Sequence, residues 1–403
     1  MPEQTTENGH LLASELQDIC RRLDPTRLCT QGNDQIFAEP NPATEEFLKS
    51  LDIVGYNYTG RWRKRAETLY YDDKKNNPSW LMLGTENPAA AGRRGDYRMD
   101  IPVSSWQRPY FAAPVNVGKL LRFTESYDYV IGDFMWTGID HLGEAHWPNR
   151  SSSSGVIDTC GFPKDHFYFY KSVWSKQDMM ANPATKPMIH LFPHRNLNEE
   201  TGTVLPVLCY TNCTYVELFV NGVSYGKKAS SFPLYGMTKT FGHFDSPQVA
   251  ASTDDLFLSW DVPFAQGEME AVGYIDGNEA CRLKVQTAGE PAKIVASADT
   301  DVLKANGRDI AHIEIAFEDA TGILNPVATN EVQIKVEGPA ELIGIDNGKP
   351  DCHRSFKGES KAAYNGKLLG ILRAGRETGD VAVTVSSDGL EDVVIRVAVK
   401  SVV

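Results

Sequence analysis

The sequence predicts a multidomain protein in which an α/β part is followed by two all-β parts. Two observations carry this prediction. The pattern changes from apolar runs and helical stretches to short alternating strands beyond Lys186, and the segment 288–291, Ala-Gly-Glu-Pro, divides the alternating part again. At 403 residues the chain is long enough for two or three domains of roughly 100 to 200 residues each. The predicted domains are 1–185, 186–288 and 291–403.

The α/β part opens with a predicted helix over 11–23, which places its leucines and Ile19 on one stripe before Asp24-Pro25 ends it. Four apolar runs follow, and each ends in polar, aromatic or glycine residues: 27–31, 52–58, 80–86 and 129–136. Catalytic groups of a (β/α)8 barrel lie at the C-terminal ends of its strands, so this order favours barrel strands. Because a whole barrel needs eight strands over roughly 250 residues, we predict the C-terminal half of a (β/α)8 TIM barrel.

The two later parts are predicted to be immunoglobulin-like β-sandwich domains. Asn-Gly, Asp-Gly and Gly-Asn turns separate alternating strands in the first, as in 216–228 and 271–280. The segment from Pro291 to Val403 alternates in the same way.

Composition excludes several classes of partner. The 40 basic and 53 acidic residues give a formal charge of −13, without the clustered Lys/Arg stripe that a nucleic acid backbone requires. No apolar run approaches the roughly 18 residues of a membrane span. The seven cysteines are scattered and are interpreted as free buried thiols. Cys209 and Cys213 could pair only across a bend, and no His/Cys grouping has zinc spacing, so neither a metal site nor a cofactor is predicted.

Glu86 is the strongest candidate for a catalytic residue. Its run ends in Gly-Thr-Glu, which places one carboxylate at a strand end beside a loop of small residues. A glycosidase nucleophile needs such a group, ionised, rigidly held and open on one side to a sugar carbon. A helix N-cap or a surface glutamate after a strand would give the same pattern without catalysis.

Two other strand ends supply polar and aromatic groups. The run 52–58 ends in Tyr56, Asn57 and Tyr58, which could donate hydrogen bonds to a carboxylate or to sugar hydroxyls, although such tyrosines are also ordinary barrel packing. The residues around the end of the fourth run are Trp136, Asp140, His141 and Glu144. A tryptophan face stacks on a pyranose and carboxylates hold its hydroxyls, whereas a barrel tryptophan is also a common core residue.

Together these pieces resemble glycoside hydrolase family 2, the family of β-galactosidases and β-glucuronidases, in its bacterial branch with two extra β-domains. The resemblance covers nearly the whole chain. It is carried by GTEN (84–87), RRGDY (93–97), FMWTGIDHLGE (134–144), SSGVIDTCGFPKDHFYFYKSVW (153–174), HLFPHRNL (190–197), VELFVNGVSYGKK (216–228), ADTDVLKANGRDI (298–310) and GIDNGKPDCHRSF (344–356).

The resemblance assigns a role to each candidate. Glu86 would be the nucleophile of a retaining enzyme, Tyr58 would donate a hydrogen bond to it, and Asn57 would line the sugar subsite. Trp136 would form the floor of that subsite, with Asp140 and Glu144 as further substrate-binding residues. His141 stands where the family usually has an aromatic residue.

The resemblance also bears on what lies upstream. Residues 1–27 are similar to the family segment that directly follows the Asn-Glu dipeptide carrying the general acid/base, and that dipeptide does not precede them here. Glu3 and Glu7 lie close by, but neither follows an asparagine at the end of an apolar strand. We therefore expect the acid/base to be missing from this chain, which alone should be nearly inactive.

The implied substrate is a β-linked glycoside. β-Galactosides are the first choice, and β-glucuronides or β-mannosides are the next. The sequence leaves an oligomer open and does not fix the localisation, although the resemblance favours a periplasmic or secreted full-length protein. The alternative function is a non-catalytic carbohydrate-binding or adhesin-like module, which the immunoglobulin-like C-terminal segment would also fit.

A half barrel leaves strand edges and an apolar surface uncovered, and both promote aggregation. We predict that the 403 residues alone are poorly soluble or pair with the missing half. Analytical ultracentrifugation and thermal melting check this, and a monodisperse preparation that melts cooperatively would contradict it.

Overall fold

The computed structural model describes residues 2–37, 42–62, 65–66, 68–87, 92–97, 112–182, 184–229, 237–239, 248–250 and 256–401. These residues fall into two compact units. The first comprises the described residues of 1–91, 111–138 and 231–257, and the second those of 92–110, 139–230 and 258–403. Residues 139–185, expected with the α/β part, thus group with the β-strands. The domain boundaries themselves stay a prediction.

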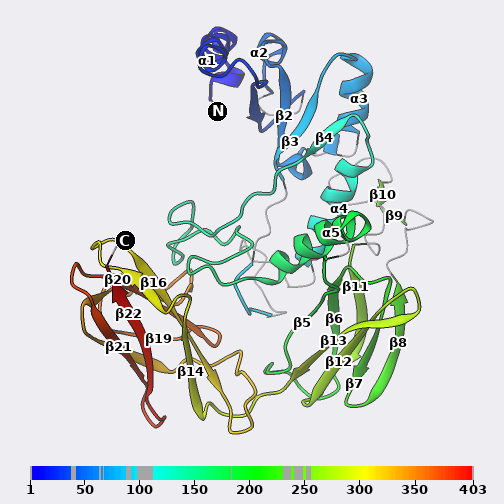
Figure 1. Ribbon diagram of the computed structural model, residues 1–403. Coiled ribbons are helices and arrows are strands. Elements are labelled where there is room, and N and C mark those ends of the chain that lie inside the picture. The colour runs from blue at the N-terminus through cyan, green and yellow to red at the C-terminus, as the bar shows by residue number, and fades with distance from the viewer. Residues whose placement is uncertain are drawn as a thin grey trace. The chain divides into compact units, whose positions relative to one another are not determined.

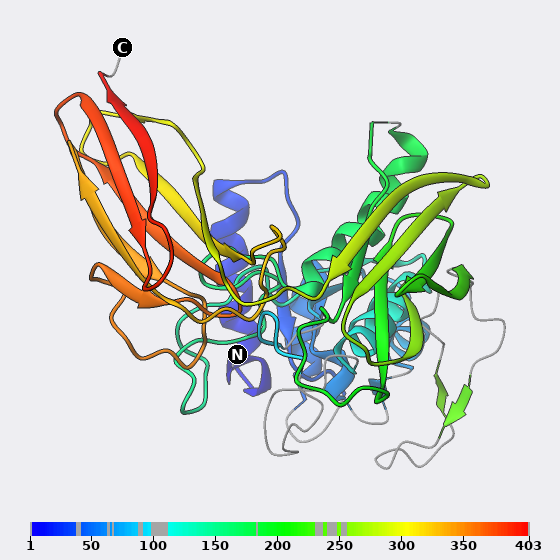
Figure 2. The same ribbon diagram turned by 90° about the horizontal axis from the view of Figure 1, so that it is seen from below.

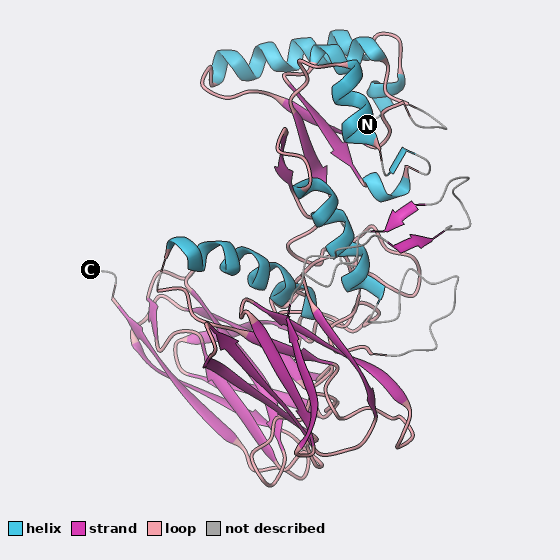
Figure 3. Cartoon of the chain, turned by 90° about the vertical axis from the view of Figure 1, so that its right-hand side faces the viewer, coloured by secondary structure: helices cyan, strands magenta, loops and turns pink. Residues whose placement is uncertain are grey.

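The first unit is built on a four-stranded parallel sheet with the order β1-β2-β3-β4 (Figures 1 and 3). Parallel strands need crossover connections, and helices supply them here. The elements are η1 (Pro2–Thr5), α1 (Gly9–Leu23), β1 (Thr30–Asn33), α2 (Glu45–Ser50), β2 (Ile53–Asn57), η2 (Thr59–Arg61), α3 (Leu69–Asn76), β3 (Met82–Glu86), α4 (Ala112–Glu125) and β4 (Val130–Asp133), with a hairpin of β9 (Met237–Lys239) and β10 (Gln248–Ala250). The parallel α/β pattern is confirmed, and its assignment to half a barrel stays a prediction.

Helix α1 forms where the sequence predicts it, but its apolar stripe faces solvent. Leu12, Leu16 and Leu23 are 43%, 47% and 82% exposed. The opposite, polar side holds the helix in place, because Gln17 Nε2 donates to the Ser50 carbonyl at 2.6 Å and Arg21 Nη2 to Asp52 at 2.7 Å. Hydrogen bonds to α2 and the start of β2 therefore fix a helix whose hydrophobic face is open.

Strand β1 is Thr30–Asn33, so the strand predicted over 27–31 begins three residues later. Asp24 accounts for the shift, because its carboxylate accepts the Thr26 amide at 3.0 Å and pairs with Arg27, which keeps 24–27 in a turn. The strands expected over 52–58 and 80–86 lie in place, and β3 ends at Glu86. The strand expected over 129–136 ends at Asp133, so Trp136 lies beyond the strand and not at its end.

The core of the first unit lies between the sheet and its helices. Val54 and Tyr56 of β2 and Met82 of β3 are buried there with Leu69 and Tyr70 of α3. Burial of such side chains contributes roughly 1.5–3 kcal/mol each. This packing holds the strand ends in a fixed relation to one another.

The second unit begins its β-structure with a sandwich of two antiparallel sheets, β11-β6-β5 and β13-β12-β7-β8. Leu218 of β7, Trp260 of β11 and Met269 of β12 are among the residues that fill the space between the sheets. The predicted Asn-Gly turn joins β7 to β8, with positive φ at Asn221 (48°) and Gly222 (79°), as a type I′ turn requires. The elements are α5 (Asp165–Ala181), β5 (Ile189–Phe192), β6 (Val204–Thr211), β7 (Tyr215–Val220), β8 (Val223–Ala229), β11 (Leu258–Pro263), β12 (Glu268–Ile275) and β13 (Asn278–Gln286).

A second sandwich follows, with sheets β14-β16-β20-β18 and β15-β22-β21-β17-β19 (Figure 2). Ile313 and Phe317 of β16 pack with Val383 of β21 in its core. Its strands are β14 (Lys293–Ala298), β15 (Val302–Lys304), β16 (Ile310–Glu318), β17 (Glu331–Glu337), β18 (Ala340–Asp346), β19 (Ser360–Ala362), β20 (Lys367–Ala374), β21 (Gly379–Ser386) and β22 (Val393–Lys400). Two β-sandwich domains are therefore confirmed.

Arg94 ties the segment 92–97 to the second sandwich. Its Nε donates to Asp158 Oδ2 at 2.7 Å, and its Nη atoms donate to the carbonyls of Asn347, Tyr364 and Asn365, each at 2.9 Å. Asp158 Oδ1 accepts two backbone amides of the loop 160–162, and Asn365 Nδ2 returns a bond to the Arg94 carbonyl at 2.7 Å. A buried charge thus has a counter-ion and hydrogen-bonded partners, as burial requires.

The neighbouring loop 147–150 is held by the same edge of the second sandwich. The Arg150 amide and guanidinium donate to the carbonyls of Pro350 and Cys352, at 2.8 and 3.0 Å. Arg93 pairs with Asp351 at 3.1 Å. The loop between β18 and β19 therefore anchors two irregular segments that precede the first sandwich.

All seven cysteines are free thiols, as predicted, but the prediction that they are buried holds only for Cys209 and Cys213. Cys20 is exposed, and the other four are partly exposed. No helix among the described residues is long and apolar enough to span a membrane.

Replacing Arg94 by methionine should lower the free energy of unfolding of the second unit by about 3–5 kcal/mol, because Asp158 would stay buried without its cation. The control is Arg373→Met on β20, whose pair with Glu341 has side chains 46% and 58% exposed, against 9% and 1% for Arg94 and Asp158. Removing that exposed pair should cost less than about 1 kcal/mol. Calorimetric melting compares the two variants, and equal transition temperatures would contradict the prediction.

Candidate active site

Glu86 is the last residue of β3, at the carboxyl edge of the parallel sheet, and is partly exposed. Ligand and catalytic groups of α/β sheets collect at this edge because the carboxyl ends of all the strands meet there. The carboxylate predicted to act as nucleophile therefore ends a strand, directly after a shift of register between β2 and β3.

Asn87 locks the backbone around Glu86 from a position that is 1% exposed. Its amide donates to the Phe134 carbonyl at 2.8 Å, just beyond β4. Its side chain joins the turn after β2, because Oδ1 accepts the Thr59 amide at 2.9 Å and Nδ2 donates to the Tyr56 carbonyl at 3.1 Å. Through its side chain and its backbone amide, this one residue thus connects the ends of β2, β3 and β4. Sequence reasoning gave it no role, although an asparagine directly after a strand-end glutamate is a visible signal.

Asn57, predicted to line the sugar subsite, lies at the end of β2, paired in register with Glu86. Its Oδ1 accepts the Thr85 hydroxyl at 2.5 Å, and its carbonyl accepts Trp62 Nε1 at 3.1 Å. A Cβ built at Gly32 of β1 would lie 2.4 Å from Asn57 Oδ1, so only glycine leaves room for this amide. The structure therefore brings Asn57 next to the strand end that carries Glu86.

Tyr58 follows in a left-handed conformation with φ 47°, and its backbone amide donates to the Glu86 carbonyl at 2.8 Å. This bond holds the two strand ends together through the main chain. A hydrogen bond from the Tyr58 hydroxyl to the nucleophile stays a prediction.

Trp136 lies three residues beyond β4, partly exposed and joined to Thr137 by a cis peptide bond. It belongs to the first unit, whereas Asp140 and Glu144 belong to the second. Asp140 is 4% exposed, and its Oδ1 accepts Lys164 Nζ at 2.7 Å and the Gly155 amide at 2.8 Å. These contacts favour a structural role for Asp140, because its carboxylate is already engaged by buried partners.

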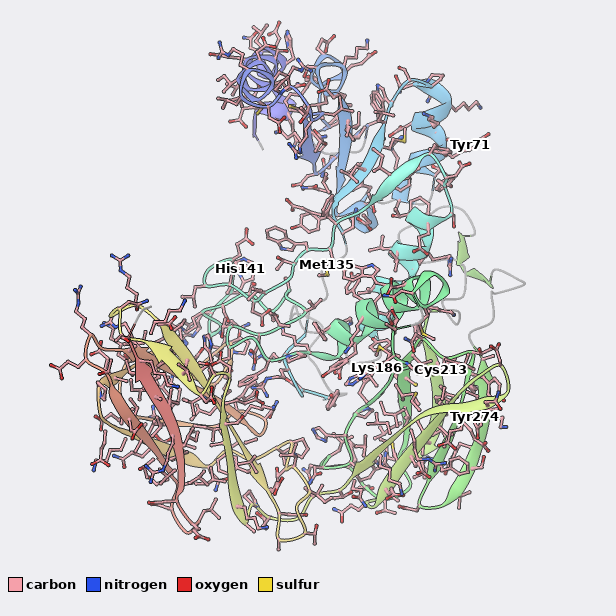
Figure 4. All side chains as sticks on the ribbon, viewed as in Figure 1. Tyr71, Met135, His141, Lys186, Cys213 and Tyr274 are labelled. Atoms are coloured by element: carbon pink, nitrogen blue, oxygen red, sulfur yellow. The ribbon has the colours of Figure 1, made fainter. Side chains whose placement is uncertain are left out.

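Glu144 is exposed, and its carboxylate lies 3.2 Å from His141 Nε2. Figure 4 labels His141 on the irregular segment that leads to α5. Its Nδ1 lies 3.1 Å from the Ser152 hydroxyl, so the residue that departs from the family pattern links two parts of this segment. The substrate-binding roles of Asp140 and Glu144 stay predictions.

Asp133, at the end of β4, is a titratable group that sequence reasoning missed. A Cβ built at Gly84 would lie 2.2 Å from its Oδ1, so the glycine two residues before Glu86 makes space for this carboxyl group. Burial raises the pKa of Asp133 to about 7. Only its position after an apolar strand could have pointed to it.

Among the described residues, no three His, Cys, Asp or Glu side chains gather in an arrangement that could hold a metal ion.

Comparison with known proteins gives a matching family model for each of the two sandwiches. The model of "glycoside hydrolase family 2 C-terminal domain 5" matches residues 294–396, and that of a domain of unknown function, DUF4982, matches 202–281. A β-galactosidase of Bacteroides ovatus is 30% identical over 96% of this chain and 43% of its own length. A β-glucuronidase of Formosa agariphila is 27% identical over 86% of this chain and 35% of its own.

Solved structures agree with this. A glycosyl hydrolase family 2 member of Bacteroides cellulosilyticus has a TM-score of 0.76 at 25% identity and covers 98% of this chain and 48% of its own. A β-glycosidase of Bacteroides vulgatus has a TM-score of 0.75 at 28% identity, with 96% and 49% covered. The chain therefore spans less than half the length of these relatives.

The raised pKa of Asp133 predicts a pH dependence of stability. An unfolded aspartate has a pKa of about 3.9, so the folded chain binds this proton more tightly, and stability falls as the pH rises from about 4 to 7. The full loss is on the order of 4 kcal/mol. Asp133→Asn should remove it, so that melting temperatures at pH 5 and pH 8 differ less than in the wild type.

The control is Asp128→Asn, which changes an exposed aspartate of the same segment. If Asp133→Asn and Asp128→Asn lose the same stability between the two pH values, Asp133 does not titrate as described.

Proposed function

The chain belongs to glycoside hydrolase family 2, as the C-terminal part of such a protein, and from this we propose that it carries the nucleophile of a retaining β-glycosidase. Glu86 is that nucleophile. The general acid/base belongs to a segment outside these 403 residues.

One observation carries the proposal: Glu86 ends a parallel strand, partly exposed, on a backbone that neighbouring strand ends hold in place. Asn87 and the Tyr58 amide provide that hold. A nucleophile in a double displacement must approach the anomeric carbon without reorganising, and a backbone fixed on both sides supplies this.

The reaction proceeds in two steps. The Glu86 carboxylate attacks the anomeric carbon while the acid/base residue protonates the leaving oxygen, and a glycosyl ester forms. Water, deprotonated by the same acid/base residue, then cleaves the ester and restores Glu86. The overall configuration is retained, which needs the two carboxyl groups roughly 5 to 5.5 Å apart.

Asn57 and Trp136 bind the sugar in this proposal. The Asn57 amide next to Glu86 donates a hydrogen bond to a hydroxyl of the bound ring, and the Trp136 ring stacks on its apolar face. The Asn57 side chain is neutral, so it selects the sugar ring by hydrogen-bond geometry and not by charge. An uncharged ring such as galactose is therefore our first substrate class, and the relative named a β-galactosidase supports this choice. Comparison of kcat/KM for β-galactosides, β-glucuronides and β-mannosides decides between the sugars.

Glu86→Gly in the full-length protein should lose hydrolysis by several orders of magnitude but gain a reaction with azide. Azide enters the space left by the carboxylate and attacks the anomeric carbon once, so an activated β-glycoside gives the α-glycosyl azide. Removal of the acid/base would give the β-azide instead, because Glu86 would still form the glycosyl ester. NMR of the product distinguishes the two.

The matched control is Glu125→Gln, which changes an exposed glutamate at the end of α4 and should leave turnover unchanged. No azide product from Glu86→Gly would refute the assignment of the nucleophile. Glycan binding that survives Glu86→Gln, in a full-length protein without turnover, would favour the non-catalytic module.

A further inference from the structure

Two cysteines far apart in sequence meet in the first sandwich. Cys213 lies in the turn between β6 and β7, and Cys281 lies on β13. Their sulfur atoms are 3.5 Å apart across a sequence separation of 68 residues. Cys213 is 1% exposed, whereas Cys281 is partly exposed (Figure 4 labels Cys213). Neither thiol has a role in the proposed glycosidase chemistry.

The space in which they meet exists because β12 carries a glycine between them. Gly273 pairs with Val216 of β7 on one side and with Cys281 of β13 on the other. A Cβ built at Gly273 would lie 2.7 Å from Cys213 Sγ and 3.1 Å from Cys281 Sγ. Any larger residue would push the thiols apart.

The turn holds Cys213 in this place. Its amide donates to the Thr211 hydroxyl at 3.0 Å, and that hydroxyl donates to the Met188 carbonyl at 2.7 Å. Hydrogen bonds of the turn therefore fix the position of Cys213, and the pairing of β13 with β12 fixes the position of Cys281.

The two thiols differ in acidity. The hydrogen bond with Cys281 lowers the pKa of Cys213 to about 7, and the same contact, together with burial, raises the pKa of Cys281. Cys209, four residues before Cys213, has no such neighbour to lower its pKa, and burial raises it. At neutral pH the pair thus holds a reactive thiolate, which is the nucleophile in disulfide exchange.

We propose that Cys213 and Cys281 are a disulfide-forming site that is oxidised by small disulfides. Cys281, the accessible thiol, passes its proton to the Cys213 thiolate beside it and displaces one thiolate from the oxidant to give a mixed disulfide. The released thiolate takes up the proton from Cys213. The Cys213 thiolate then attacks Cys281 Sγ and expels the second thiolate. Two protein thiols are oxidised, and one small disulfide is reduced to two thiols.

The cross-link would fasten an edge of the sandwich. A disulfide has its sulfur atoms about 2.05 Å apart, so they need to approach by only about 1.5 Å. β13 is the outermost strand of its sheet and pairs with β12 alone, and the bond would tie it to the turn before β7. Because the closed loop is long, the unfolded chain would lose much of its freedom.

The test treats the purified protein with oxidised glutathione or with dithiothreitol, unfolds it, alkylates the free thiols and maps peptides by mass spectrometry. We expect a peptide pair linked through Cys213 and Cys281 after glutathione, its loss after dithiothreitol, and a melting temperature higher by roughly 5–15 °C in the oxidised form. Cys213→Ser should instead accumulate glutathione on Cys281.

Cys209→Ser is the matched control, and it should form the same linked pair as the wild type. If wild-type Cys213 and Cys281 both remain alkylatable after glutathione, or if Cys213 links to Cys209 instead, the proposal is overturned. The wild-type map needs no variant to fold, and it is independent of glycosidase activity.

Discussion

The hydrogen bonds of Asn87 are the interaction on which the candidate site depends. Parallel strands end in backbone groups that no neighbouring strand satisfies, and such groups are costly to bury unpaired. Asn87 meets this constraint with both ends of its side-chain amide and with its own N–H, and so connects three strand ends. Glu86 precedes Asn87 by one residue, so the same hydrogen bonds hold the backbone of Glu86 in place. Gly32 and Gly84 serve the same edge by leaving space for Asn57 and Asp133.

In the second unit, charged side chains hold irregular backbone segments in place. Irregular segments around 92–97 and 147–164 lack a sheet of their own, and the second sandwich supplies their partners through Arg94, Arg150 and the loop after β18. An arginine suits this task because its donors form a planar fork that can bond several carbonyls at once. The C-terminal sandwich is thus part of the support for residues that follow the nucleophile in sequence.

Much of this could be predicted from local patterns. The parallel strands, Glu86 at the end of β3 and the Asn221-Gly222 turn follow from hydrophobic runs and turn residues, which act over a few positions. Other features depend on distant partners. β1 starts late because Asp24 forms a turn, and the three carbonyl acceptors of Arg94 lie more than 250 residues away. The contact of Cys213 with Cys281 depends on a glycine in a third strand, which no spacing rule for cysteines contains.

The acceptors of Arg94 have an evolutionary consequence. Three of its partners are main-chain carbonyls, at Asn347, Tyr364 and Asn365, and a carbonyl is present whichever residue occupies the position. The residues at these positions can therefore change while the hydrogen bonds to Arg94 remain, provided that the backbone keeps its path. Correlated substitutions between relatives would record side-chain contacts, such as that of Arg94 with Asp158, but not these carbonyls. A search for covarying positions would then miss most of this attachment, and insertions or deletions in the loop would be its more sensitive record.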